Sequence, residues 1–274
     1  MPATTKPLLG AALMTDSLAA NRAWILERQR DLEIQDFCEV DVIAGDWRPL
    51  VEKIKRQLDG YTGRLGVHGP FYGFNIATPD PDVRAVVKKR LHQGLDICAM
   101  LGATQMVVHS PFTTWNHYNL NGRPGTRQAL IERTHLAMAE IVKRAEDMGL
   151  VIVIENIEDN DATSRVELVR SFNSAAVRVS LDTGHANYAR GVTNGPPVDH
   201  HIHVAGELLH HVHLQDTDGY ADRHWHPGEG NISWPWVFEA LGRLTSRPRL
   251  ILEVDDFIGV QKGWRHLVAL GLAE

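Results

Sequence analysis

Cysteine is scarce in this chain: its 274 residues include only Cys38 and Cys98. Both stand among apolar residues, and their spacing matches neither a zinc knuckle nor a redox pair, so we expect two buried free thiols in a reducing compartment. The apolar run at 7–14 is not followed by a small-residue cleavage site, which favours a first strand over a secretory leader. We therefore expect a cytoplasmic protein.

Long apolar runs and basic stripes are missing as well. No stretch approaches the ~20 apolar residues that a membrane span needs. The chain carries 28 Lys and Arg residues against 34 Asp and Glu residues, a net charge of −6. Because no run of Lys and Arg forms a stripe, neither a nucleic acid nor a membrane is an expected partner.

The sequence does contain a regular alternation of short apolar runs with longer amphipathic runs. The short runs are rich in Val, Ile and Leu, as is typical of strands buried on both faces. They span residues 7–14, 32–37, 64–69, 104–110, 150–156, 176–182, 209–215 and 249–254. Helical spacing is clearest over 81–102 and 125–149, where Gly102 and Gly149 are expected to end the helices.

No linker or change of composition divides the chain, so we expect a single α/β domain over residues 1–274. Eight strands alternating with eight helices predict a (β/α)8 TIM barrel. In such a barrel the catalytic groups stand at the carboxyl ends of the strands.

Six of the apolar runs end in residue types that ligate metals. These residues are His68, His109, Glu155, Asp182, His213 and Glu253. Any one of them alone would more often be a helix cap or a hydrogen-bonded core residue. Six that converge on one barrel mouth predict a functional site.

The last four of these residues form a mixed oxygen and nitrogen donor set. Buried acids and an imidazole that face one another would repel or stay desolvated unless a cation joined them. Glu155, Asp182, His213 and Glu253 suit Mn²⁺, Mg²⁺, Co²⁺ or Zn²⁺, and the absence of thiolate argues against a closed structural zinc site. We expect a divalent ion here, with Mn²⁺ favoured.

Several motifs carry a resemblance to a known family. They are HGPFYGFNIATPDP at 68–81, VVHSPF at 107–112, VIENIED at 153–159, SLDTGHA at 180–186, HVHLQDTDG at 211–219, DRHWHPGEGNISW at 222–234 and LEVDD at 252–256. Over nearly its whole length the chain resembles the xylose-isomerase-like barrel superfamily, and most of all its sugar phosphate isomerase/epimerase branch. The resemblance is specific for the fold and the metal but not for the substrate.

The resemblance implies a metal-dependent isomerase or epimerase that acts on a sugar, a keto-sugar or a sugar phosphate. In the epimerases of this group, the residues that match Glu155, Asp182, His213 and Glu253 bind one divalent metal, and the two glutamates are the catalytic acid/base pair. Removal of the proton beside a carbonyl would give an enediolate that the metal stabilises. No glycine-rich phosphate cradle is recognisable, so a free sugar fits at least as well as a phosphorylated one.

Related enzymes leave alternatives open. The superfamily includes the three-zinc endonuclease IV type of DNA-repair enzyme, and a lyase of the inosose-dehydratase type would use the same groups; a metal-binding protein without catalysis is a further alternative. The additional candidate metal ligands are His68, His109, His185, Asp222 and His224. No DNA-inserting loop is recognisable after the first three strands, which favours the isomerase.

Other side chains near the strand ends are candidates for binding a small carbohydrate substrate. They are His68, His109, Trp115, Glu158, His185 and Arg223, with Phe71 and Trp225 as apolar walls. We expect the loop at 222–224 to form a wall of the site. The histidines at 200, 201 and 203 lie on a helix expected outside the barrel, so we interpret them as surface residues. The sequence is compatible with a homo-oligomer but does not fix the number of subunits.

Overall fold

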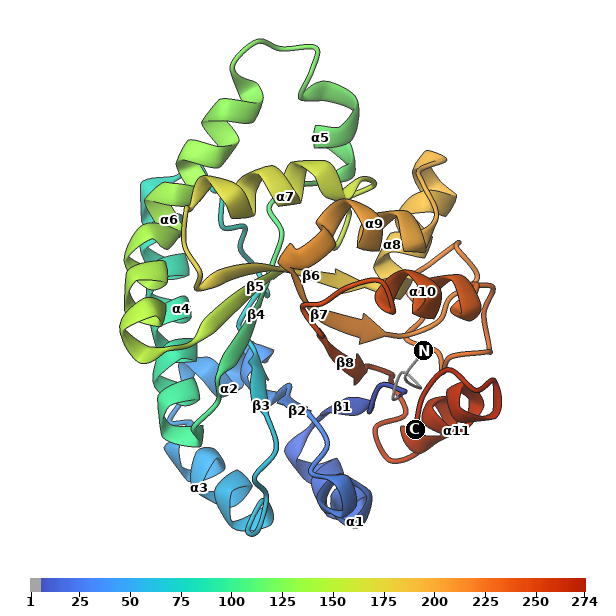
Figure 1. Ribbon diagram of the computed structural model, residues 1–274. Coiled ribbons are helices and arrows are strands. Elements are labelled where there is room, and N and C mark those ends of the chain that lie inside the picture. The colour runs from blue at the N-terminus through green and yellow to red at the C-terminus, as the bar shows by residue number, and fades with distance from the viewer. Residues whose placement is uncertain (1–5) are drawn as a thin grey trace.

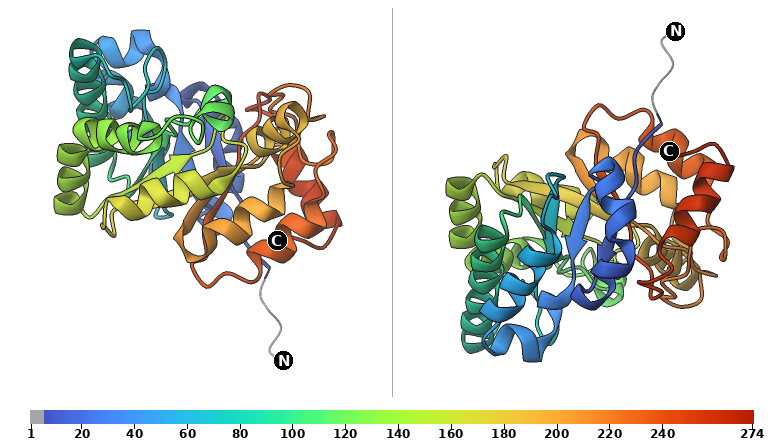
Figure 2. Two further views of the ribbon diagram at one scale, coloured as in Figure 1. Left: turned by 90° about the horizontal axis from the view of Figure 1, so that it is seen from above. Right: turned by 90° about the horizontal axis from the view of Figure 1, so that it is seen from below.

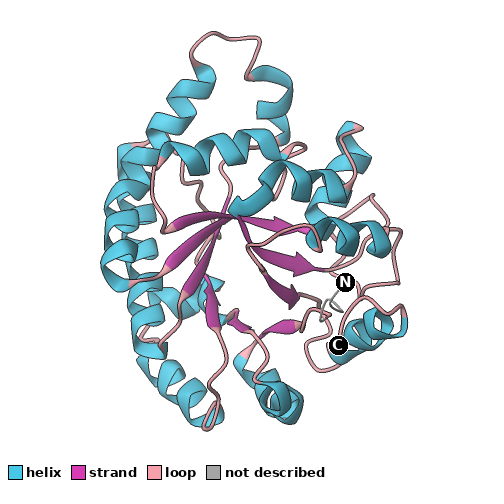
Figure 3. Ribbon diagram, in the orientation of Figure 1, coloured by secondary structure: helices cyan, strands magenta, loops and turns pink. Residues whose placement is uncertain are grey.

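The computed structural model describes residues 6–274, and a closed ring of eight parallel strands forms its centre (Figures 1 and 3). Neighbours in the ring follow chain order, and β1 pairs with β8 to close it. The strands are β1 (Gly10–Leu13), β2 (Leu32–Ile34), β3 (Leu65–His68), β4 (Gln105–His109), β5 (Val151–Glu155), β6 (Val177–Asp182), β7 (Leu209–Leu214) and β8 (Arg249–Leu252). The predicted (β/α)8 barrel is thus confirmed.

Helices surround the ring, and the N-terminal and C-terminal halves of the chain lie on opposite sides of it (Figure 2). The α-helices are α1 (Leu18–Arg28), α2 (Val40–Ala44), α3 (Arg48–Gln57), α4 (Pro81–Leu101), α5 (Thr114–Asn119), α6 (Thr126–Met148), α7 (Ala162–Ser171), α8 (Thr183–Thr193), α9 (Val198–Ala205), α10 (Trp234–Leu241) and α11 (Gln261–Ala269). Short 3-10 turns span Thr15–Ser17, Asp36–Cys38 and Gly206–Leu208.

Local chemistry explains where the long helices begin and end. The Asp80 carboxylate accepts hydrogen bonds from the backbone N–H groups of Asp82 and Val83 and so caps α4. Gly102 after α4 and Gly149 after α6 have φ angles of 70° and 65°, in the left-handed region that favours glycine. Both predicted helices and both glycine ends are confirmed.

The number of helices differs from the prediction. Residues 6–274 form eleven α-helices rather than eight, because β2, β4 and β6 are each followed by two helices instead of one. The additional helices are α2, α5 and α8, and each stands between its strand and the helix that leads to the next strand. The extra helices therefore belong to the βα loops, which build the mouth of the barrel.

The interpretation of one histidine as a surface residue is wrong. Helix α9 lies outside the ring, as expected, but His201 is only 1% exposed. Val198, His201, Ile202 and Ala205 form the buried face of α9, and their spacing of three, four and seven residues puts His201 on the apolar stripe. His203 is exposed, as predicted, and His200 is half-buried.

Two further expectations concern the cysteines and membranes. Cys38 and Cys98 are both free and buried, as predicted. Within residues 6–274, no helix is both long enough and apolar enough to span a membrane.

Candidate metal centre

Four acidic and imidazole side chains meet at the carboxyl ends of the strands. Glu155 ends β5, Asp182 ends β6, His213 is the penultimate residue of β7, and Glu253 follows β8 directly. All four are buried, and each offers a ligand atom within 4.8 Å of those of the other three. The predicted ligand set is therefore brought together in space, from strands far apart in the sequence.

His213 stands at the centre of this group. Its Nδ1 atom lies 2.9 Å from Oε1 of Glu155, 3.2 Å from Oε2 of Glu253 and 4.0 Å from Oδ2 of Asp182. One ring nitrogen thus faces three carboxylates.

The donors fit a divalent cation. Oε2 of Glu155 and Oδ2 of Asp182 are buried without a hydrogen-bond partner among residues 6–274, although a buried polar atom normally has one. Three carboxylates and one imidazole, with no thiolate, are ligands that Mn²⁺, Mg²⁺, Co²⁺ and Zn²⁺ accept. An ion held by Glu155, Asp182, His213 and Glu253 would satisfy both orphaned oxygens.

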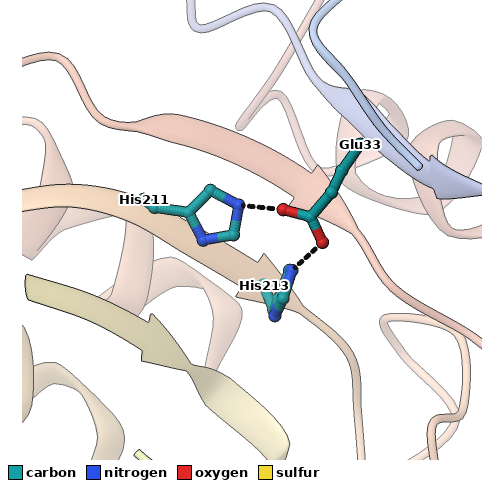
Figure 4. Close-up of side chains that lie close together, drawn as sticks. All are labelled: Glu33, His211 and His213. Carbon is teal, nitrogen blue, oxygen red and sulfur yellow. Dashed lines mark hydrogen bonds and ion pairs between the residues drawn. The ribbon is translucent and has the colours of Figure 1, made fainter. Parts of the chain in front are cut away.

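Glu33 on β2 is a central residue that the sequence reasoning missed. Its Oε1 atom lies 2.9 Å from Nε2 of His213, and its Oε2 atom lies 3.0 Å from Nε2 of His211 (Figure 4). Nδ1 of His211 in turn lies 2.9 Å from Oγ of Ser180. Metal-ligating histidines commonly hold a carboxylate on the second ring nitrogen, which fixes the proton there and leaves the first free for the ion.

Two glutamines hold the carboxylates in place and were also missed. Gln215 donates from Nε2 to Oδ1 of Asp182 at 3.2 Å and to Oδ1 of Asp222 at 2.9 Å. Gln35, just after β2, donates from Nε2 to Oε1 of Glu253. A Cβ atom on Gly184 would lie 2.1 Å from the Gln215 side chain, so this position needs a glycine.

The charges of the group shift its proton affinities. Burial lowers the pKa of His213, but the carboxylates of Glu253, Glu155 and Glu33 outweigh burial and hold this pKa well above its usual value. Burial raises the pKa of Glu155, yet the charge of His213 brings it well below the ordinary value. Burial raises the pKa of Asp182 to about 7. The surrounding carboxylates therefore favour the proton-bearing form of His213 when no cation is bound.

A second group lies beside the first. Nε2 of His68 and Nε2 of His109 are 3.5 Å and 3.9 Å from Oε2 of Glu155. The ring of Phe71 stacks on His109, with centroids 3.9 Å apart, and its role as a wall for a sugar ring stays a prediction. His109 and Phe71 line a cavity of about 140 Å³ together with Glu158, Phe112 and other residues.

The third group joins His185 on α8 to Asp222 and His224 in the loop after β7. Oδ2 of Asp222 lies 3.2 Å from Nε2 of His185 and 3.3 Å from Nε2 of His224. Buried Asp216 folds this loop back onto the barrel, because its carboxylate accepts hydrogen bonds from the N–H groups of Gly228 and Ile232 and from the Trp234 indole. The loop at 222–224 is therefore next to the candidate metal ligands.

The remaining candidate substrate contacts are spread around the mouth. Glu158 lines the 140 Å³ cavity and accepts a hydrogen bond from the N–H of Thr114. Arg223 pairs with Asp218 at 2.9 Å, and its guanidinium lies over the ring of Trp225. Trp115 on α5 is 51% exposed and does not line that cavity. Their contacts with a substrate stay predictions.

Comparison with known proteins shows the family of this chain. The model of the xylose isomerase-like TIM barrel family matches residues 33–270. The chain belongs to this family. A D-psicose 3-epimerase of Ruminiclostridium cellulolyticum is 27% identical over 208 residues, which are 71% of this chain and 64% of that protein. A ketose 3-epimerase of Arthrobacter globiformis is 24% identical over 179 residues, 62% of this chain and 56% of that protein.

Solved structures of the family share the fold. The TTHB071 protein of Thermus thermophilus, soaked with ZnCl₂, superposes with a TM-score of 0.73 at 24% identity, and the match covers 96% of this chain and 97% of that one. The chain thus has sugar epimerases among its relatives, and the matched part spans less than two thirds of the two curated epimerases.

Glu33→Gln should weaken metal binding about 10- to 100-fold, because the amide no longer fixes the His213 proton as a carboxylate does. Titration calorimetry with Mn²⁺ on the metal-stripped protein measures this change directly. Glu39→Gln, at an exposed position just after the same strand, is the matched control and should bind Mn²⁺ like the unmodified protein. Equal affinities for both variants would contradict the role of Glu33.

Metal affinity should fall as pH falls. A ligating Nδ1 must be free of its proton, and the raised pKa of His213 means that protons compete with the ion up to and above neutral pH. We expect a loss of affinity of at least about tenfold per pH unit below neutrality, because Asp182, with a pKa of about 7, also takes up a proton there, and proton release should appear as a dependence of the calorimetric heat on the buffer. Affinity that stays constant from about pH 8 to about pH 6 would refute this expectation.

Proposed function

We propose that the protein is a divalent-metal-dependent sugar epimerase or isomerase. The observation that carries the proposal is the buried set of Glu155, Asp182, His213 and Glu253, in which two glutamates from different strands flank one imidazole. The epimerases among the relatives support the same class of reaction. Mn²⁺ is the favoured ion.

The residues divide the work between holding an ion and moving a proton. A bound divalent ion would stabilise the negative charge that develops on the sugar oxygens when a proton leaves the carbon beside the carbonyl. Glu155 on β5 and Glu253 after β8 approach from different sides, so one carboxylate can remove the proton and the other can return it. The lowered pKa of Glu155 keeps that carboxylate ionised, which is the form that a general base needs.

The neighbouring cavity supports a sugar as substrate. Its walls combine aromatic rings with polar groups, since Phe71, Phe74 and Phe112 line it together with His109 and Glu158. Aromatic rings pack against the C–H faces of a sugar, and the polar groups can bind its hydroxyls. A carbonyl carbon held near Glu155 would place the rest of the molecule in this cavity.

The direct test is incubation of Mn²⁺-loaded protein with ketoses and aldoses in D₂O, followed by NMR. Epimer or isomer formation with deuterium on the carbon beside the carbonyl is the expected result, and a chelator should abolish it. Loss of water from the sugar would instead favour a lyase. Absence of any exchange across the panel would contradict the proposal.

Glu155→Gln and Glu253→Gln should each reduce deuterium exchange at least about 10³-fold, because an amide cannot accept the proton. Metal content, measured on the same samples, separates loss of the ion from loss of the base. Glu27→Gln, at an exposed position, serves as the control and should exchange normally. Full exchange by either variant would show that the glutamate replaced in it is not a member of the acid/base pair.

A three-ion phosphodiesterase is the second candidate. The observations that favour it are the two additional groups, His68 with His109 and Glu155, and His185 with Asp222 and His224. The third group is, however, internally paired, because Asp222 contacts both imidazoles at 3.2 and 3.3 Å. Burial lowers the pKa of His224, but Asp222 and Glu253 outweigh it and raise this pKa to about 9, so the imidazole can balance the Asp222 charge as a proton-bearing partner.

The double change Asp222→Ala with His224→Ala distinguishes the candidates. If one ion is held by the set around His213, metal stoichiometry should stay at one per chain and sugar turnover should fall. Mass spectrometry of the metal content, at equal zinc or manganese loading of variant and unmodified protein, checks this. Loss of one metal equivalent, together with cleavage of an abasic DNA duplex by the unmodified protein, would favour the three-ion hydrolase.

A further inference from the structure

A second, larger cavity has walls that include none of the candidate metal ligands. Its volume is about 410 Å³. Its walls come from the loops after β4, β5 and β6, including α5 and the residues that follow α8. These loops build the mouth of the barrel, the face on which the metal ligands stand.

The larger cavity adjoins the smaller one. Phe112 and Thr113 line both, and Oγ of Ser110, in the wall of the smaller cavity, donates to Oδ1 of Asp159, in the wall of the larger, at 2.9 Å. The smaller cavity reaches His109, which is 3.9 Å from Glu155. A molecule whose reacting end lies at Glu155 can therefore extend past Thr113 into the larger cavity.

Only the larger of the two cavities has the volume of a typical small-molecule site. Small-molecule sites commonly measure about 300–1,000 Å³. The cavity beside His109, at about 140 Å³, is below this range, whereas the adjoining cavity, at about 410 Å³, is within it. The two together offer more room than a single sugar ring needs.

The lining of the larger cavity is polar, and its one Arg side chain has an acidic partner among the described residues. The uncharged lining consists of the amides Asn116, Asn121, Asn160 and Asn194, several hydroxyls, the imidazole of His117 and a few apolar groups. The charged members of the lining already have partners. Arg127 pairs with Glu167 at 2.8 Å, buried Asp159 pairs with Arg165 at 2.9 Å, and Asp161 caps α7 through the N–H of Thr163.

This chemistry selects a neutral ligand rich in hydroxyl groups. A phosphate or carboxylate would need an unpaired cation, which the lining residues within 6–274 do not provide. Amide and hydroxyl side chains pair with sugar hydroxyls, and Phe112, Leu120 and Pro196 offer apolar surface to the C–H face of a ring.

The walls are tied to one another before any ligand arrives. Glu158 accepts a hydrogen bond from the N–H of Thr114 at 2.7 Å, which joins the loops after β5 and β4. Asn160 and His117 are joined by a second contact of 2.9 Å between the same two loops. A site whose walls are already fixed loses little entropy when a ligand binds.

We propose that this cavity binds a second sugar unit, so that the substrate is a ketose joined to another ring rather than a free monosaccharide. The proposal rests on the proposed function for the reacting end of the molecule. The 410 Å³ cavity itself would recognise the neutral second ring independently of turnover.

The test compares D-fructose with its 4-O- and 6-O-glucosylated forms as substrates of the Mn²⁺-loaded protein. The glucosylated ketoses should have a KM at least about tenfold lower. Asn121→Trp, which fills the cavity from an exposed position, should remove that advantage and leave KM and kcat for D-fructose unchanged. Gln128→Trp, on α6 near the cavity but not in its lining, is the control and should keep the preference.

A binding measurement without turnover separates the two proposals. Saturation-transfer NMR with maltose should show contact with the unmodified protein and with Gln128→Trp, but not with Asn121→Trp. Maltose binding without exchange on any ketose would overturn the proposed function and support the cavity. Equal KM values for D-fructose and its glucosides, or maltose binding that Asn121→Trp does not change, would overturn the second-sugar site.

Discussion

The contact between His213 and the carboxylates around it is the interaction on which the rest of the site depends. One buried imidazole meets Glu33 through Nε2 and faces Glu155, Asp182 and Glu253 through Nδ1. Buried charges of one sign are costly unless a cation offsets them. In the metal-free protein a proton on His213 takes that part, and a divalent ion can replace the proton. The same carboxylates therefore raise the affinity of this site for a proton and for a divalent ion.

The closed barrel makes this contact possible. Its members come from β2, β5, β6, β7 and the end of β8, which only a ring can bring around one point. A polar layer lies one step deeper, where His211 contacts both Glu33 and Ser180, although branched apolar residues usually fill this region of a TIM barrel. That layer orients Glu33, Glu33 orients His213, and Gln215 links Asp182 to the loop that carries Asp222. Residues in the barrel interior thus orient the side chains at its mouth through a series of hydrogen bonds and ion pairs.

The strands and the meeting of the four candidate ligands could be predicted because both follow from the apolar runs. Apolar runs give the strands, and a polar residue where such a run ends gives a side chain at the mouth. Glu33 was not predicted because it lies inside its strand, between Leu32 and Ile34, rather than at the strand end. A single acid within an apolar run could nevertheless have indicated a functional residue. His211 shares a strand face with His213 by the two-residue repeat, a second signal that was available.

Other features could not be predicted because they depend on tertiary packing. The extra helices α2, α5 and α8 sit in loops whose course is set by contacts distant in the sequence. The larger cavity is likewise assembled from three separate loops, so no local pattern announces it. The burial of His201 is an exception, because the three-, four- and seven-residue spacing of Val198, His201, Ile202 and Ala205 was a signal in the sequence that was overlooked.

Diffraction from crystals grown with Mn²⁺ at neutral pH, recorded near the manganese absorption edge, tests the central claim most directly. We predict one anomalous peak per chain, in contact with Glu155, Asp182, Glu253 and Nδ1 of His213, with Glu33 still on Nε2. A structure with no peak among these four residues, or with the ion bound elsewhere and His213 still paired to its carboxylates, would contradict the account.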